Sequence, residues 1–221
     1  MHEPGPVTTG AGRSPRALID AGAREMGIEL NDAQIDRLAR HCAEIELWNP
    51  RLKLVAASGA ELAIRHVLDS LSAVSLLSQS RTIADVGSGA GFPGIPIAVA
   101  NPDATVHLVE RSGRRCGFLR NAVAVVPVPN ARVVEAETER ANLSVDAVVL
   151  RAYHPLTSEL VATLARLLAP SGVIVAYKGR RTTAEAEIDG LHRGGSANIE
   201  LIPVDVPFLD EERHLIVIRP A

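Results

Sequence analysis

The sequence predicts an α/β protein built on a seven-stranded, mostly parallel sheet with an antiparallel last strand and an N-terminal helical extension. From Arg81 onward, short apolar runs alternate with helical segments, which is the pattern of a doubly wound sheet. The acidic segment between the last two runs, 207–213, is too short for a crossover helix, so those strands should pair antiparallel. The expected strands are 83–86, 105–109, 131–134, 147–150, 172–177, 199–206 and 214–218.

Capping patterns predict helices ahead of the sheet. Asn31 and Gln34 have the spacing of a capping box, and they open a helix that Pro50 should end, because proline disfavours helical geometry in the residue before it. Ser58 and Glu61 form a second box before another helix. The apolar face of that helix is Ile64, Val67, Leu68 and Leu71, and the connecting helices of the sheet are expected over 112–123 and 155–168.

The chain divides into three regions by composition. Residues 1–13 are rich in Gly, Pro and Thr, and we expect them to form a disordered arm. Residues 14–80 should form the helical extension packed on the core. Residues 81–221 should form the core that binds a cofactor.

Composition excludes several classes of protein. The chain has 221 residues, is 47% hydrophobic and carries a formal net charge of −3, which argues against a protein that coats nucleic acid through a broad basic surface. No apolar run approaches the ~20 residues of a membrane span, and the first residues lack the features of a signal peptide. Cys42 and Cys116 have no metal-like spacing. We therefore expect a cytoplasmic monomer with no bound metal and no membrane partner.

A glycine-rich turn follows the first strand, and it permits two interpretations. Gly89, Gly91 and Gly94 have the spacing of the dinucleotide fingerprint, and Glu110 lies 21 residues beyond Gly89, as in a nicotinamide-dependent enzyme. Asp85 and Gly87 extend the same turn into the first loop of an S-adenosylmethionine (SAM) methyltransferase. The carboxylate of Asp85 can accept from the SAM amino group, whereas in a dinucleotide site it would repel the pyrophosphate.

The ends of the later strands carry further candidates, because ligands of doubly wound sheets bind outside the carboxyl ends of the strands. Glu110 can accept from the hydroxyls of a ribose. Ala136 leaves room for an adenine ring, whose edge a backbone N–H or the carboxylate of Glu137 can meet. Arg151 can pair with a carboxylate or phosphate, and Lys178 could hold substrate phosphates.

The helix before the sheet carries polar residues on one side. His66, Asp69 and Ser70 are spaced i, i+3 and i+4, which suits either a local His–Asp contact or a helix that borders the substrate pocket. A hydrolase is rejected because no Gly-x-Ser-x-Gly elbow is present. Arginines also gather around the helix after the second strand, where they form either a phosphate contact or a solvated face; they are Arg111, Arg114, Arg115 and Arg120.

Several segments together resemble the bacterial RsmG (GidB) family of ribosomal RNA methyltransferases. They are 48–49, 66–71, 85–96, 118–120, 136–137, 151–152, 155–156, 178–179 and 212–215. The resemblance implies a Rossmann-like SAM-dependent methyltransferase fold and methylation of guanine N7 in small-subunit (16S) ribosomal RNA, free or in a ribosomal particle. By position it implies that Gly87, Phe92, Ala136, Glu137 and Arg151 contact the cofactor.

Guanine N7 has a lone pair and no proton, so this chemistry needs orientation more than a base. No general acid or base is assigned, and the candidates on the substrate side are Arg151, Lys178, His66 and Asp69. Two alternatives remain open at this point. An NAD(P)-dependent oxidoreductase is motivated by the spacing that starts at Gly89, and a non-catalytic RNA-binding assembly factor is motivated by the arginine cluster.

Overall fold

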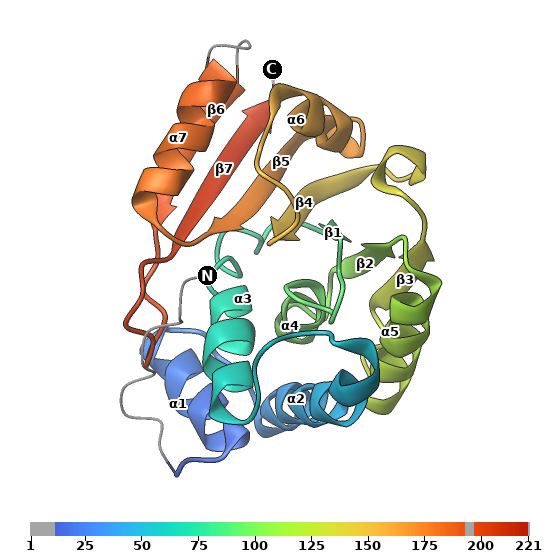
Figure 1. The fold of residues 1–221 in the computed structure, drawn as a ribbon, viewed down its shortest axis with the longest axis vertical. Coiled ribbons are helices and arrows are strands. Elements are labelled where there is room, and N and C mark those ends of the chain that lie inside the picture. Colours follow the sequence, from blue (N-terminus) through green and yellow to red (C-terminus); the bar gives the residue numbers. More distant parts are fainter. Residues whose placement is uncertain (1–11, 193–196, 221) are drawn as a thin grey trace.

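The computed structural model describes residues 12–192 and 197–220, which form one sheet with helices on both faces (Figure 1). The strands are β1 (Thr82–Val86), β2 (Thr105–Glu110), β3 (Ala131–Glu135), β4 (Val145–Arg151), β5 (Leu168–Lys178), β6 (Ala197–Pro203) and β7 (His214–Pro220). The helices are α1 (Pro15–Glu25), α2 (Asp32–Leu52), π-helical η1 (Leu62–Leu68), α3 (Asp69–Leu71), α4 (Gly94–Ala100), α5 (Gly113–Val125), 3-10 helical η2 (Thr138–Arg140), α6 (Ser158–Ala165) and α7 (Arg181–His192).

The sheet has the strand order β3-β2-β1-β4-β5-β7-β6. The first five strands in this order run parallel, and β7 pairs antiparallel with both β5 and β6. This confirms the prediction of seven strands with an antiparallel last strand. Because the winding reverses between β1 and β4, the carboxyl ends of these two strands border the crevice in which such folds bind ligands.

Two hydrophobic cores lie on opposite faces of the sheet. The larger core joins one face to α4, α5 and the N-terminal helices, and the smaller core packs α6 and α7 on the other face. The apolar residues expected on the helix before the sheet lie in η1 and α3. They are Ile64, Val67, Leu68 and Leu71, and they are fully buried in the larger core. The N-terminal helices are therefore part of the same packed body as the sheet.

The capping box at the start of α2 is confirmed, but the predicted end of this helix is wrong. Asn31 and Gln34 exchange side-chain to backbone hydrogen bonds of 2.9 Å. The helix continues through Pro50 to Leu52 and closes at Lys53, whose N–H donates to the carbonyl of Asn49 and whose φ is 50°. Pro50 lies in the last turn of the helix. Because proline has no N–H to donate, one hydrogen bond of the helix is missing there.

Other predicted boundaries also differ from the structure. At the expected box, the N–H of Glu61 donates to the backbone carbonyl of Ser58 at 3.1 Å, and η1 begins after Glu61 with no side-chain cap. The helix expected over 155–168 is only α6, because β5 already begins at Leu168, and α7 was not predicted.

Of the expected disordered arm, residues 1–11 lie outside the described residues. Within the described ranges, no helix has the length and hydropathy of a membrane span.

The close approach of α4 to the sheet depends on Gly94. A Cβ on Gly94 would lie 2.4 Å from Cδ2 of Leu108 and 2.6 Å from Oδ2 of Asp85, so no side chain fits there. Gly117, on the exposed side of α5, has no atom within 4 Å of such a Cβ.

We expect Gly94→Ala to lower the free energy of unfolding by about 1–3 kcal/mol, because the added methyl must push strand and helix apart. Gly117→Ala is the matched control and should raise stability by about 0.5–1 kcal/mol through its higher helix propensity. Urea denaturation of both variants measures the difference. Equal stability of the two variants would contradict the packing described for Gly94.

Candidate functional site

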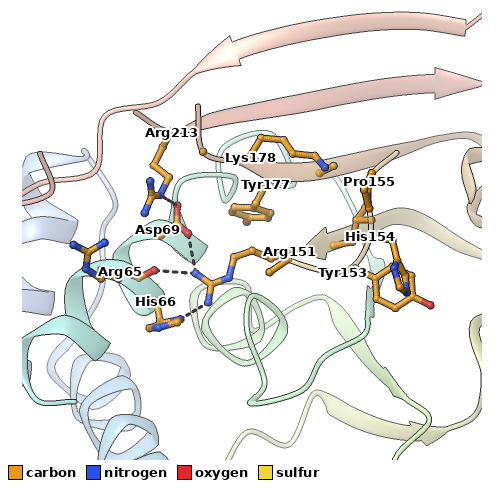
Figure 2. Close-up of a pocket in the computed structure, with 14 residues that line it drawn as sticks. Arg65, His66, Asp69, Arg151, Tyr153, His154, Pro155, Tyr177, Lys178 and Arg213 are labelled. Atoms are coloured by element: carbon orange, nitrogen blue, oxygen red, sulfur yellow. Dashed lines mark hydrogen bonds and ion pairs between the residues drawn. The ribbon is translucent and has the colours of Figure 1, made fainter. Parts of the chain in front are cut away.

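The crevice at the carboxyl ends of the strands holds two cavities. The larger, about 660 Å³, lies between η1, the segment after β4 and the end of β5 (Figure 2). The other, about 540 Å³, lies over Gly87, Glu110 and Glu137. Ala152, Tyr153 and His154 line both cavities, so these three residues form the wall between them.

The backbone N–H groups of the glycine loop donate to acceptors within the protein. The N–H groups of Gly87 and Ser88 donate to the carbonyl of Val109 at 2.9 and 3.1 Å, and that of Gly89 donates to Oε2 of Glu110 at 3.0 Å. Farther on, the N–H of Gly94 donates to Oδ2 of Asp85. A dinucleotide site needs such N–H groups for the pyrophosphate. Their engagement, beside two carboxylates, disfavours the nicotinamide interpretation.

Asp85 is fully buried at the end of β1, and its second oxygen has no partner. Oδ2 accepts from Gly94 at 3.0 Å, whereas Oδ1 has no hydrogen-bond partner among the described residues. Burial raises the pKa of Asp85 to about 7. A buried carboxylate oxygen without a donor fits a ligand that brings a cationic N–H group, such as the amino group expected of SAM.

The cavity over Glu110 has the carboxylates predicted for a nucleoside. Glu110 is held by the N–H of Ser112 at 2.8 Å and by that of Gly89, and it is almost fully buried. The N–H of Ala136 donates to the carbonyl of Glu110 at 3.1 Å, so among the backbone N–H groups considered for the adenine edge this one is engaged within the protein. The carboxylate of Glu137 is exposed and remains the other option.

Arg151 is the centre of the larger cavity. Its Nη1 donates to Oδ2 of Asp69 at 2.8 Å and to the carbonyl of Arg65 at 2.9 Å, and its Nη2 donates to Nδ1 of His66 (Figure 2). The guanidinium carbon also lies 5.3 Å from the centre of the Phe92 ring. His66 and Asp69 thus meet on Arg151, which is the pocket-bordering arrangement considered for this helix, and not the local His–Asp contact.

The π-helical geometry of η1 explains why a backbone carbonyl faces Arg151. In an α-helix, the N–H of Asp69 would donate to the carbonyl of Arg65, four residues earlier. Here it donates to the carbonyls of Ile64 and His66 instead. The carbonyl of Arg65 therefore does not receive the N–H of Asp69, and it accepts from Nη1 of Arg151, in a π-helical turn of the kind often found at functional sites.

Histidine rings on both sides of Phe92 connect the glycine loop to the N-terminal helices. His66 stacks on Phe92 with centroids 5.0 Å apart, and His41 of α2 lies 4.8 Å from the same ring. His41 also donates from Nε2 to the carbonyl of Ala90 at 2.9 Å. Burial lowers the pKa of His41 to about 4 and, with Arg151, that of His66 to about 3, so both rings are neutral. Sequence reasoning missed His41, because a single histidine in an amphipathic helix gives no signal.

Two further candidates, Lys178 and Arg120, are paired within the protein. Nζ of Lys178 lies 2.6 Å from the carboxylate of Glu187 on α7, which also accepts from the N–H of Leu156. Arg120 pairs with Glu135. Arg213, from a matched segment but not singled out, lies 3.5 Å from Asp69. Within the part of the chain that the structure describes, no group of His, Cys, Asp and Glu side chains could hold a metal ion.

Known proteins with similar sequences are methyltransferases of ribosomal RNA. A family model described as rRNA small subunit methyltransferase G (GidB) matches residues 34–216. A ribosomal RNA small subunit methyltransferase G from Treponema pallidum is 42% identical over 189 residues, 82% of this chain and 83% of the relative. Its counterpart from Chromobacterium violaceum is 37% identical over 90% of this chain and 95% of the relative.

Solved structures show the same fold at low identity. The O-methyltransferase TomG from Streptomyces achromogenes, determined with SAM, has a TM-score of 0.58 at 16% identity and covers 95% of this chain and 100% of its own. A precorrin-6y C5,15-methyltransferase from Geobacter metallireducens has a TM-score of 0.53 at 20% identity, covering 76% of this chain and 91% of its own. The predicted Rossmann-like methyltransferase fold is confirmed.

We expect Arg151→Met to lower the free energy of unfolding by about 3 kcal/mol, because it removes the 2.8 Å ion pair of the buried Asp69 and leaves it the longer contact to Arg213. Arg151→Met/Asp69→Asn should cost about 1–3 kcal/mol less than the sum of the single variants. Urea denaturation of the double-mutant cycle measures this coupling. The exposed pair of Arg219 and Glu200 is the control, with an expected coupling below about 1 kcal/mol.

Asp85 should make stability depend on pH. Its pKa in the folded protein is raised to about 7 from an ordinary 3.8. Its contribution to the free energy of unfolding is therefore complete below the ordinary pKa and is lost as the pH rises through 7. Asp85→Asn removes this loss. The stability of the variant relative to the parent should therefore rise by about 2–3 kcal/mol from about pH 5 to about pH 8. A pH-independent difference would show that Asp85 is ionised throughout.

Proposed function

Because this chain belongs to the rRNA small subunit methyltransferase G family, we infer that it transfers a methyl group from SAM to N7 of a guanine in small-subunit (16S) ribosomal RNA. It is an enzyme, a SAM-dependent methyltransferase of ribosomal RNA. The observation that carries the cofactor assignment is the buried, unpartnered oxygen of Asp85 at the end of β1.

Of the proposed cofactor contacts, Gly87, Glu110, Ala136 and Glu137 line one cavity and Arg151 lines the other, whereas the remaining loop residues and Asp85 line neither. Asp85 accepts from the amino group, and Glu110 accepts from the ribose hydroxyls at the neighbouring strand end. Ala136 and Glu137 border the adenine. The loop residues Gly87, Gly89, Gly91 and Phe92 and the side chain of Arg151 complete the contact surface. The positive φ angles of the three glycines, 74°, 53° and 86°, let the loop follow a ligand closely.

SAM, when bound, supplies a methyl group already activated for transfer. Guanine N7 needs no deprotonation, so the protein contributes orientation and exclusion of water. His66 is suited to orienting groups of the site and not to acting as a base, since its Nδ1 accepts a hydrogen bond from Arg151. Asp69 holds the same guanidinium from the other side, so both residues act by fixing Arg151.

The larger cavity suits an anionic substrate. Arg65, Arg151, Lys178 and Arg213 line it, and Asp69 is the acidic residue among its lining side chains. We propose that this cationic rim contacts phosphates next to the target guanine, with Lys178 held in place by Glu187. The base itself must leave its stack to enter the cavity.

We further propose that residues 14–80 form an extension that supplies His66 and Asp69, and that residues 81–221 form the core that binds SAM. Only Leu47, Leu76 and Val125 are large exposed apolar side chains among the described residues, which supports a monomer. The ribosomal substrate supports a cytoplasmic location, as do two buried cysteines that form no disulfide.

The test is incubation of the purified protein with methyl-labelled SAM and 16S RNA, as free RNA and as assembled small subunits, followed by nucleoside mass spectrometry. We expect labelled 7-methylguanosine in at least one of the two substrates. Calorimetry should show binding of S-adenosylhomocysteine (SAH) and none of NADH. Label on another base atom would overturn the N7 assignment, and no label at all with intact SAH binding would favour the assembly factor.

We expect Asp85→Asn to weaken SAH binding at least about tenfold, because the amide cannot replace the charge that meets the ligand's amino group. Asp103→Asn, in the exposed turn before β2, makes the same charge change outside the crevice and should leave the dissociation constant unaltered. Isothermal titration calorimetry measures both. Equal affinities of the two variants would remove Asp85 from the site.

A further inference from the structure

Tyr153 lies where the two cavities of the crevice meet. It follows β4 directly after Ala152, whose backbone has the left-handed φ of 50°. The ring of Tyr153 lies against the glycine loop: a Cβ on Gly87 would come within 2.4 Å of its Cδ2. The aromatic ring therefore fills the space directly over the first glycine of the loop.

The ring of Tyr153 is held at its far end as well. Its phenol oxygen lies 3.0 Å from Oγ1 of Thr138, which is almost fully buried at the start of η2. The ring of His154 meets it edge-on at 4.6 Å (Figure 2). Tyr153 thus bridges the segment after β4 and the segment after β3, across the carboxyl ends of β1 and β2.

This position conflicts with the proposed function, on which the present inference rests. The adenosine part of SAM is assigned to the cavity over Glu110 and Glu137, and its amino group is assigned to Asp85. One molecule that reaches both parts of the crevice has to pass over Gly87. In this structure that path is covered by the Tyr153 ring.

We propose that Tyr153 contacts the target base and couples its binding to cofactor binding. Cofactor binding separates the ring from Gly87 and breaks its hydrogen bond to Thr138. The ring turns into the larger cavity, whose wall it already forms, and there it offers a flat face on which the guanine stacks. The order of binding follows from this: the cofactor enters first and completes the pocket for the RNA base.

The first test separates this role from a purely structural one. Tyr153→Phe and Thr138→Val each remove the hydrogen bond and keep the size of the side chain. Both variants should lower the melting temperature of the ligand-free protein but bind SAH about three- to tenfold more tightly, because that bond no longer has to break. The double variant should bind no more tightly than either single one. A structural role predicts lower stability together with unchanged or weaker SAH binding, and that result overturns the proposal.

The second test addresses the base. With saturating SAM, Tyr153→Ala should lower kcat/KM for 16S RNA at least about tenfold more than Tyr153→Phe does, because only the phenylalanine keeps a ring for stacking. Equal losses in the two variants would overturn the stacking role. If the unaltered protein itself fails to bind SAH, the proposed function fails. If it binds SAH and the variants bind no more tightly, only the role of Tyr153 fails.

Discussion

The ion pair between Arg151 and Asp69 is the interaction on which the crevice depends, because its partners come from regions that the sheet alone would not bring together. Arg151 ends β4, whereas Asp69, His66 and the carbonyl of Arg65 come from the helix that precedes the sheet. A buried arginine needs several acceptors, and the core strands supply none of those named here. The N-terminal helices therefore complete the site. Without them the guanidinium would lose its partners, and Phe92 would lose the rings that flank it.

A second constraint is the cost of keeping a carboxylate at the base of the glycine loop. Asp85 accepts one backbone N–H, and burial raises its pKa to about 7, so the folded protein holds it at the expense of stability near neutral pH. A fold selected for stability alone would place an apolar residue here. The contact proposed between Asp85 and the amino group of SAM would offset this cost. The loop amides bond within the protein and leave little for a pyrophosphate.

The sequence was sufficient for the sheet and for the edge at which the candidate residues gather, because strand periodicity and glycine spacing are local signals. Asp85, Glu110 and Arg151 lie at that edge as predicted. The π-helical turn, the passage of α2 through Pro50 and the contact of His41 with the loop were not predictable, since each depends on packing between segments far apart in the chain. The ion pair between Lys178 and Glu187 was not predictable either, because the sequence of α7 has no clear helical pattern.

The π-helical segment also limits how this protein can change its length. A π-helical turn accommodates an additional residue relative to an α-helical one, and here it moves the N–H of Asp69 away from the carbonyl of Arg65, which accepts from Arg151. Deleting one residue between Leu62 and Leu68 would remove this additional residue and restore α-helical pairing, in which each carbonyl accepts from the N–H four residues later. The helix would stay intact, but its own N–H would compete with Arg151 for the carbonyl of Arg65. Insertions and deletions among natural variants should therefore avoid this segment and fall in the connections on either side of it.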